Sequence, residues 1–78
     1  MDNRETLHER TLAHLSKALG SDKGEAAFGT ALKKVAKHRI ETPQDLFLVA
    51  QILMELGGVT AIVGQTLKIQ ALLRGAKQ

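Results

Sequence analysis

The stretch that decides the fold runs from Thr42 to Arg74 and reads TPQDLFLVAQILMELGGVTAIVGQTLKIQALLR. It opens with a strong helix-start signal, because Thr can cap a helix, Pro suits the first helical position and Asp45 places an acid in the first turn. From Leu46 onward the apolar side chains lie around almost the whole circumference of a helix. Such a helix must be wrapped by other helices, so the stretch predicts an all-α protein.

Gly57 and Gly58 interrupt this apolar pattern and leave two interpretations open. Two adjacent glycines can end one helix and let another begin. They can also be tolerated inside a single helix, at a cost of about 1 kcal/mol each. A single helix over residues 43–74 would be roughly 48 Å long, which a chain of this size cannot cover by itself. The second interpretation therefore requires a partner chain.

The N-terminal half predicts two further helices. Asp2 or Asn3 serves as the expected N-cap of the first, which stops at Gly20, and Ser21 is the expected N-cap of the second. Each segment carries apolar residues at helical spacing. The resulting prediction is a small bundle of three to four helices over residues 3–19, 22–38, 43–56 and 59–74, the last two either separate or continuous.

The size and composition of the chain indicate how such a bundle is stabilised. The 78 residues are 44% hydrophobic and 24% charged, which is typical of a folded domain, and none is cysteine. A core this small gives marginal stability, and disulfides are excluded as a remedy. We therefore expect one domain, residues 1–78, completed by homo-oligomerisation or by docking on a helical protein partner.

The apolar face of residues 46–73 is the predicted docking surface. One row of side chains alternates three and four residues apart, as the core positions of coiled coils do. Beside it, small residues recur every seven residues and would let another helix approach closely. The expected interface residues are Leu46, Val49, Ala50, Leu53, Leu56, Gly57, Val63, Gly64, Leu67 and Ala71. This pattern favours a non-enzymatic interaction or oligomerisation module.

A basic cluster supports a second hypothesis, a small dimeric regulator that binds nucleic acid. The net charge is +3 and the isoelectric point is about 9.6. Four lysines fall on one side of the helix predicted over residues 22–38, where they could contact phosphates. They are Lys23, Lys33, Lys34 and Lys37. No arginine lies in this row and no aromatic side chain is interleaved to stack bases, so sequence-specific recognition is not supported.

Catalytic and metal-binding patterns do not occur in the sequence. The serines lack the setting of an activated nucleophile, and no phosphate loop or dinucleotide fingerprint is present. The spacing of His8 and His14 does not place both rings on one helix face, and we expect His8 to be a partly buried histidine beside a neighbouring helix. We therefore expect no enzymatic activity, metal, cofactor or small-molecule substrate.

The run from Leu46 to Gly64 is long enough to raise the question of a membrane span. Gln51 and Glu55 interrupt it, and basic residues lie on both of its sides, so membrane insertion is disfavoured. The polar residues 1–5 do not resemble a secretory signal peptide. We expect a cytoplasmic protein.

Overall fold

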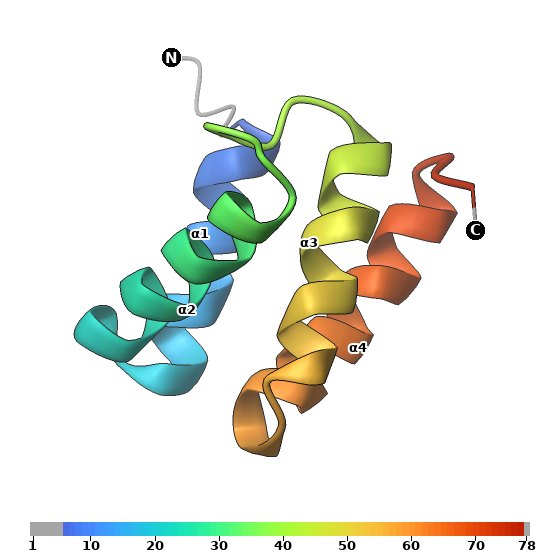
Figure 1. Cartoon of the computed structure of the whole chain (residues 1–78). Coiled ribbons are helices and arrows are strands. Elements are labelled where there is room, and N and C mark those ends of the chain that lie inside the picture. The colour runs from blue at the N-terminus through green and yellow to red at the C-terminus, as the bar shows by residue number, and fades with distance from the viewer. Residues whose placement is uncertain (1–5, 78) are drawn as a thin grey trace, which may run out of the picture.

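The computed structural model describes residues 6–77, and four helices account for most of them. They are α1 (Leu7–Leu19), α2 (Ser21–Lys34), α3 (Pro43–Glu55) and α4 (Gly58–Leu73). α1 and α2 form one helical hairpin, α3 and α4 form a second, and the loop of residues 35–42 connects the two (Figure 1). The described residues contain no strand, so the predicted all-α bundle is confirmed.

Thr42 caps α3 as the sequence predicts. Its hydroxyl accepts a hydrogen bond from the Asp45 N–H at 3.1 Å, and the Asp45 carboxylate accepts one from the Thr42 N–H at 3.2 Å. This reciprocal pair satisfies backbone donors that a helix start leaves without partners. The start of α3 is therefore fixed locally, and Pro43 occupies its first position.

α1 begins with the same kind of cap. Thr6 and Glu9 form its capping box, and the helix starts at Leu7. The caps expected at Asp2 and Asn3 lie outside the described residues.

The start of α2 differs from the prediction. Gly20 alone forms the turn after α1, with φ at 92°, and Ser21 is the first helical residue instead of the N-cap. The positive φ of Gly20 lets the chain reverse within one residue. α1 and α2 then approach closely at Gly24, where an added Cβ would lie 2.7 Å from the backbone of Ser16.

α2 also ends four residues earlier than predicted, at Lys34 instead of residue 38. Ala36 adopts φ of 58°, and the Lys37 N–H donates to the Leu32 carbonyl at 3.0 Å while the Ala36 N–H donates to the Lys33 carbonyl at 3.1 Å. These two bonds are those of a Schellman cap. The sequence prediction missed this end because alanine occupies the position where glycine is usual.

Gly57 and Gly58 form a turn, with φ of 78° and 62°. A helix that continued through both positions would need negative φ at each, so the chain breaks here and α4 begins anew with Gly58 as its first residue. α3 and α4 are therefore separate helices packed against one another, and the interpretation of residues 43–74 as one long helix is wrong (Figure 1).

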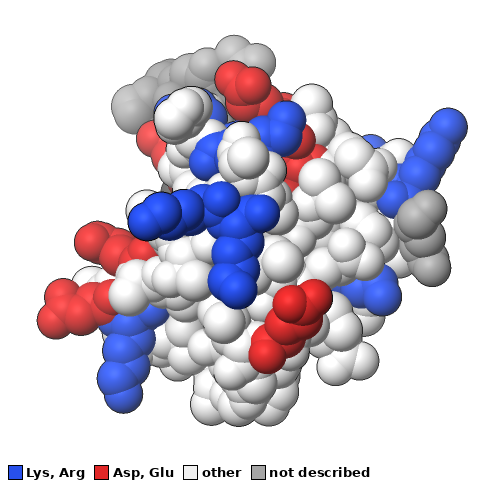
Figure 2. All heavy atoms as spheres, in the orientation of Figure 1, with Lys and Arg blue, Asp and Glu red and all other residues white. Residues whose placement is uncertain are grey.

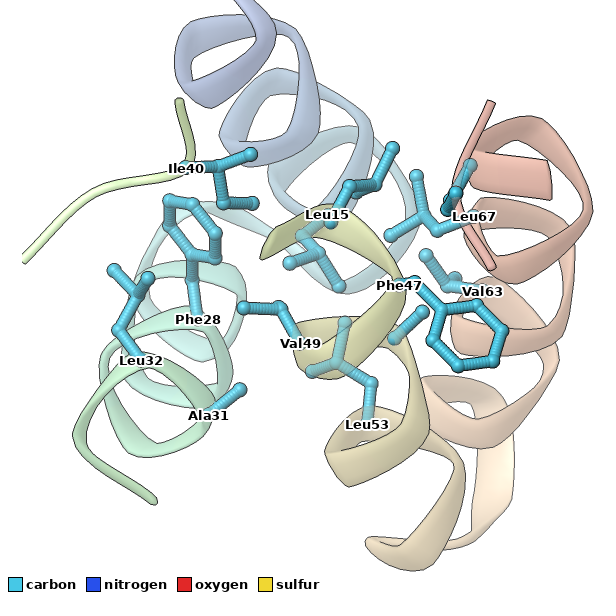
Figure 3. Packing of buried hydrophobic residues seen from close by; sticks show 14 residues of the cluster. Leu15, Phe28, Ala31, Leu32, Ile40, Phe47, Val49, Leu53, Val63 and Leu67 are labelled. Carbon is cyan, nitrogen blue, oxygen red and sulfur yellow. The ribbon is translucent and has the colours of Figure 1, made fainter. Parts of the chain in front are cut away.

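The core lies between the two hairpins. Leu15 of α1, Phe28 of α2 and Val49 and Leu53 of α3 belong to one core cluster, with the Phe28 ring directed toward Ile40, and Leu67 of α4 lies on the other side of the core (Figure 3). All six side chains are at most 3% exposed. Burial of this kind contributes about 1.5–3 kcal/mol for each large apolar side chain.

α3 and α4 make their closest approach at Gly64. A Cβ added there would lie 2.9 Å from the carbonyl oxygen of Ala50, from the Cβ of Leu53 and from the backbone nitrogen of Met54. Two of these atoms belong to the backbone of α3 and cannot rotate away. The short distance between α3 and α4 therefore depends on glycine, which has no side chain, at position 64.

His8 holds the connecting loop against α1. Its Nδ1 accepts a hydrogen bond from the Ile40 N–H at 3.0 Å, and its ring packs on that of Phe28 with centroids 4.8 Å apart. Ile40 is 1% exposed, so water cannot readily replace His8 Nδ1 as the acceptor for its N–H. The expectation that His8 is partly buried against a neighbouring helix is confirmed.

The His8 hydrogen bond requires a neutral ring, because Nδ1 must carry a lone pair. Burial lowers the pKa of His8 below its ordinary value of 6.5, and the charge of Arg39 acts in the same direction, while Glu9 opposes the shift. The neutral form is therefore favoured in the folded protein.

Gly64→Ala should destabilise the fold by about 1–3 kcal/mol, because the new Cβ meets the backbone of α3. Gly29→Ala is the matched control. Gly29 lies on an exposed part of α2 with no atom within 4 Å of an added Cβ, so alanine should stabilise the protein by about 0.5–1 kcal/mol. Urea unfolding followed by circular dichroism measures both changes, and equal stability of the two variants would contradict the close α3–α4 packing.

Stability should fall as the pH is lowered below about 6.5, the ordinary pKa of histidine. Because the pKa of His8 is lower in the folded protein than in the unfolded chain, its contribution is complete above about pH 6.5 and is lost as the pH falls through the folded-state pKa. His8→Asn keeps an acceptor near the Ile40 N–H but cannot titrate, so its unfolding free energy should depend less on pH. An unchanged pH dependence in this variant would assign the effect to other groups.

Candidate functional site

Eight of the ten residues predicted to form an interface are buried inside the chain itself. They are Leu46, Val49, Ala50, Leu53, Val63, Gly64, Leu67 and Ala71. The turn after α3 folds α4 back, so the α3 part and the α4 part of the sequence pattern face one another within a single chain, as the contact of Gly64 with Ala50 and Leu53 shows. These eight are therefore core residues of the bundle and not surface residues. Leu56, which is 44% exposed, and Gly57 remain at the surface.

The apolar surface that stays exposed lies on another side of α4. We call it the outer strip, and its members are Val59, Ile62, Thr66, Ile69 and Leu73. The four apolar members are between 54% and 82% exposed. Their positions again alternate three and four residues apart, so the strip follows one line along the helix. Large apolar side chains gathered in this way mark an interaction surface more often than scattered ones do.

Thr66, at the centre of the outer strip, does not interrupt its apolar character. Its hydroxyl donates to the Ile62 carbonyl of its own helix, with 3.4 Å between the oxygens. This hydrogen bond partly satisfies the hydroxyl within α4, so Thr66 needs no polar partner from another molecule.

Charges near α4 are distributed unevenly between its two ends. Glu55 is exposed beside the turn that precedes the helix, whereas Arg74 and Lys77 are exposed beyond its C-terminal end. Lys68, also in the C-terminal half, lies over the Phe47 ring with Nζ 5.8 Å from the centroid. The exposed charge that precedes α4 in the chain is therefore acidic, and the exposed charges that follow it are basic.

The four predicted lysines do not form one row. Lys23 and Lys34 align along α2, about 20° apart, but Lys33 lies about 80° around the helix from Lys23. Lys37 lies beyond the end of α2, in the connecting loop. Basic side chains do gather over the C-terminal end of α2 (Figure 2).

Lys37 pairs with an acid instead of standing free. Its Nζ lies 3.5 Å from Oδ1 of Asp45. Partial burial of Asp45 favours its neutral form, but the backbone N–H groups of Glu41 and Thr42 and the charge of Lys37 outweigh this effect, so the pKa of Asp45 lies below its ordinary value. Lys37 is therefore already part of the network that caps α3.

A shallow groove of about 490 Å³ runs beside the end of α2. Gly29, Leu32 and Ala36 form its apolar part, while Lys33, Lys37 and His38 supply basic groups. No aromatic side chain lines it, so it offers no surface for base stacking. Only two of the four predicted lysines align along α2, so the structure gives the nucleic-acid hypothesis less support than the sequence pattern does.

Two other classes of site find no support within residues 6–77. No group of three or more histidine, cysteine or acidic residues is placed to hold a metal ion. None of the helices combines the length and apolar character that crossing a membrane requires.

Sequence reasoning missed the outer strip, although a signal for it exists. Residues 59, 62, 66, 69 and 73 repeat three and four apart in the same way as the predicted row, shifted around the helix. Both rows satisfy the heptad rule, and only the fold decides which of them is covered.

Comparisons with protein-family models, with curated proteins and with solved structures give no match to this chain.

Proposed function

We propose that the protein is a non-catalytic interaction module that pairs with a second copy of itself through the outer strip of α4. The observation that carries this proposal is the exposure of four large apolar side chains on one line of one helix. Complete burial of a fully exposed side chain of this kind contributes about 1.5–3 kcal/mol. Because these side chains are 54–82% exposed, each would contribute a corresponding part of that amount. No charged side chain belongs to the strip, so two copies can meet without leaving a charge unpaired.

The charges flanking α4 favour an antiparallel arrangement of the two copies. A parallel pair would bring the basic C-terminal ends together, including Arg74 and Lys77 of each chain. An antiparallel pair brings this end near Glu55 of the other copy and opposes the two helix dipoles. Thr66 would then lie on the twofold axis, because Val59 precedes it by seven residues and Leu73 follows it by seven.

The length of α4 sets the strength of this dimer. Its 16 residues span about 24 Å. With a helix about 10 Å wide, the contact is smaller than the roughly 800 Å² per partner of a standard interface. Leu56, exposed just before α4, extends the apolar surface. We expect a dimer that dissociates on dilution, with a dissociation constant in roughly the micromolar range.

Ile69→Glu should convert the dimer to a monomer of 8.4 kDa, because it places a charge in the centre of an apolar contact. Light scattering coupled to size exclusion, over a range of protein concentrations, measures the mass. Gln51→Glu is the matched control, since it adds the same charge at an exposed position of α3. A wild-type protein that remains monomeric at the highest concentration would overturn the proposal.

Single cysteines test the antiparallel arrangement, because the chain has no cysteine of its own. Under mild oxidation, Thr66→Cys should link to itself, whereas Thr30→Cys, on the exposed side of α2, should not. Val59→Cys and Leu73→Cys should link to each other in a mixture but not when each is alone. Efficient linkage of each alone would indicate a parallel pair.

A further inference from the structure

A cleft between α1 and α4 combines a closed floor with a basic rim. Its volume is about 120 Å³. Thr11, Leu46 and Leu67 belong to the floor and are at most 2% exposed. The hydroxyl of Thr11 donates to the Leu7 carbonyl at 2.8 Å, so it has no hydrogen to offer a ligand. A bound molecule would therefore take its hydrogen bonds from the rim.

Two pairs of polar side chains form that rim. Arg10 and His14 stand one turn apart on α1, and Gln70 in the last turn of α4 is followed four residues later by Arg74, the C-cap of that helix. Each of these side chains can donate N–H hydrogen bonds, and the two guanidinium groups are always charged. None of the residues that line the cleft within the described range, 6–77, is acidic. Donors from α1 and from the C-terminal end of α4 thus surround one space, and the described part of its lining holds no carboxylate.

The size and charge of the cleft restrict the ligand. Pockets for drug-sized molecules measure about 300–1,000 Å³, and this cleft is smaller, although it has room for several water molecules. A carboxylate would neutralise only one of the two arginines. A phosphate group carries more than one negative charge at neutral pH and presents oxygens in several directions, which suits donors on both sides.

We propose that the α1–α4 cleft binds a phosphate group, with Arg10 and Arg74 as its charge partners and His14 and Gln70 as additional donors. This site is separate from the outer strip, because Gln70 and Arg74 line the cleft beside α1 and neither is a member of the strip. The ligand is either free inorganic phosphate or the terminal phosphate of a small monoester.

The test is a titration of the ¹⁵N-labelled protein with sodium phosphate, at constant ionic strength maintained with sodium chloride. Saturable amide shifts should concentrate at residues 10, 14, 70 and 74. A second titration with glycerol 3-phosphate separates the two ligand sources. Tighter binding of the ester assigns the site to the phosphate end of a larger solute, and tighter binding of the ion assigns it to inorganic phosphate.

Arg10→Gln and Arg74→Gln should each weaken phosphate binding about tenfold or more, since each removes hydrogen bonds to a charged group. Arg39→Gln is the control, because it removes the same charge from the connecting loop, outside the cleft. Amide spectra verify that each variant is folded. Non-saturating shifts spread over all basic residues, or an equal loss of binding in Arg39→Gln, would overturn the proposal.

Discussion

The left-handed turn at Gly57 and Gly58 determines how the apolar C-terminal half is covered. Both residues have positive φ, a conformation that other residues adopt only at an energetic cost. Because the chain reverses there, α4 lies along α3, and a row of side chains that would need a second chain on a straight helix finds its partners within the same chain. The turn therefore decides which apolar residues become core and which remain exposed.

Close packing after that turn has a further consequence for α4. Gly64 lets its backbone approach Ala50 and Met54 of α3, while Leu67 turns toward α1. α3 and α1 cover adjacent sides of α4, and the side that carries the outer strip stays exposed among the described residues 6–77. The outer strip is thus the side of an apolar helix that the packing of residues 6–77 leaves exposed.

A structural feature could be predicted from the sequence when the interaction that forms it joins residues close together in the chain. The start of α3 could be predicted because its cap joins Thr42 to Asp45, only three residues away. The end of α2 could not, because the cap uses Ala36 where the expected signal is glycine. The partner of His8 lies 32 residues away, and the cleft joins Arg10 to Arg74, so both depend on how the two hairpins pack. The heptad rows were visible, but a periodic row does not reveal whether its partner belongs to the same chain.

The residue types of the outer strip are not explained by the stability of α4 alone. Val59, Ile62, Thr66 and Ile69 are β-branched, and such residues favour a helix less than the glutamine, lysine or glutamate that an exposed position would accept. In the isolated chain they also leave apolar surface in water. A polar strip would therefore give a more stable monomer. The present strip becomes favourable only when another surface covers it, and a second α4 offers an uncharged surface of the same length.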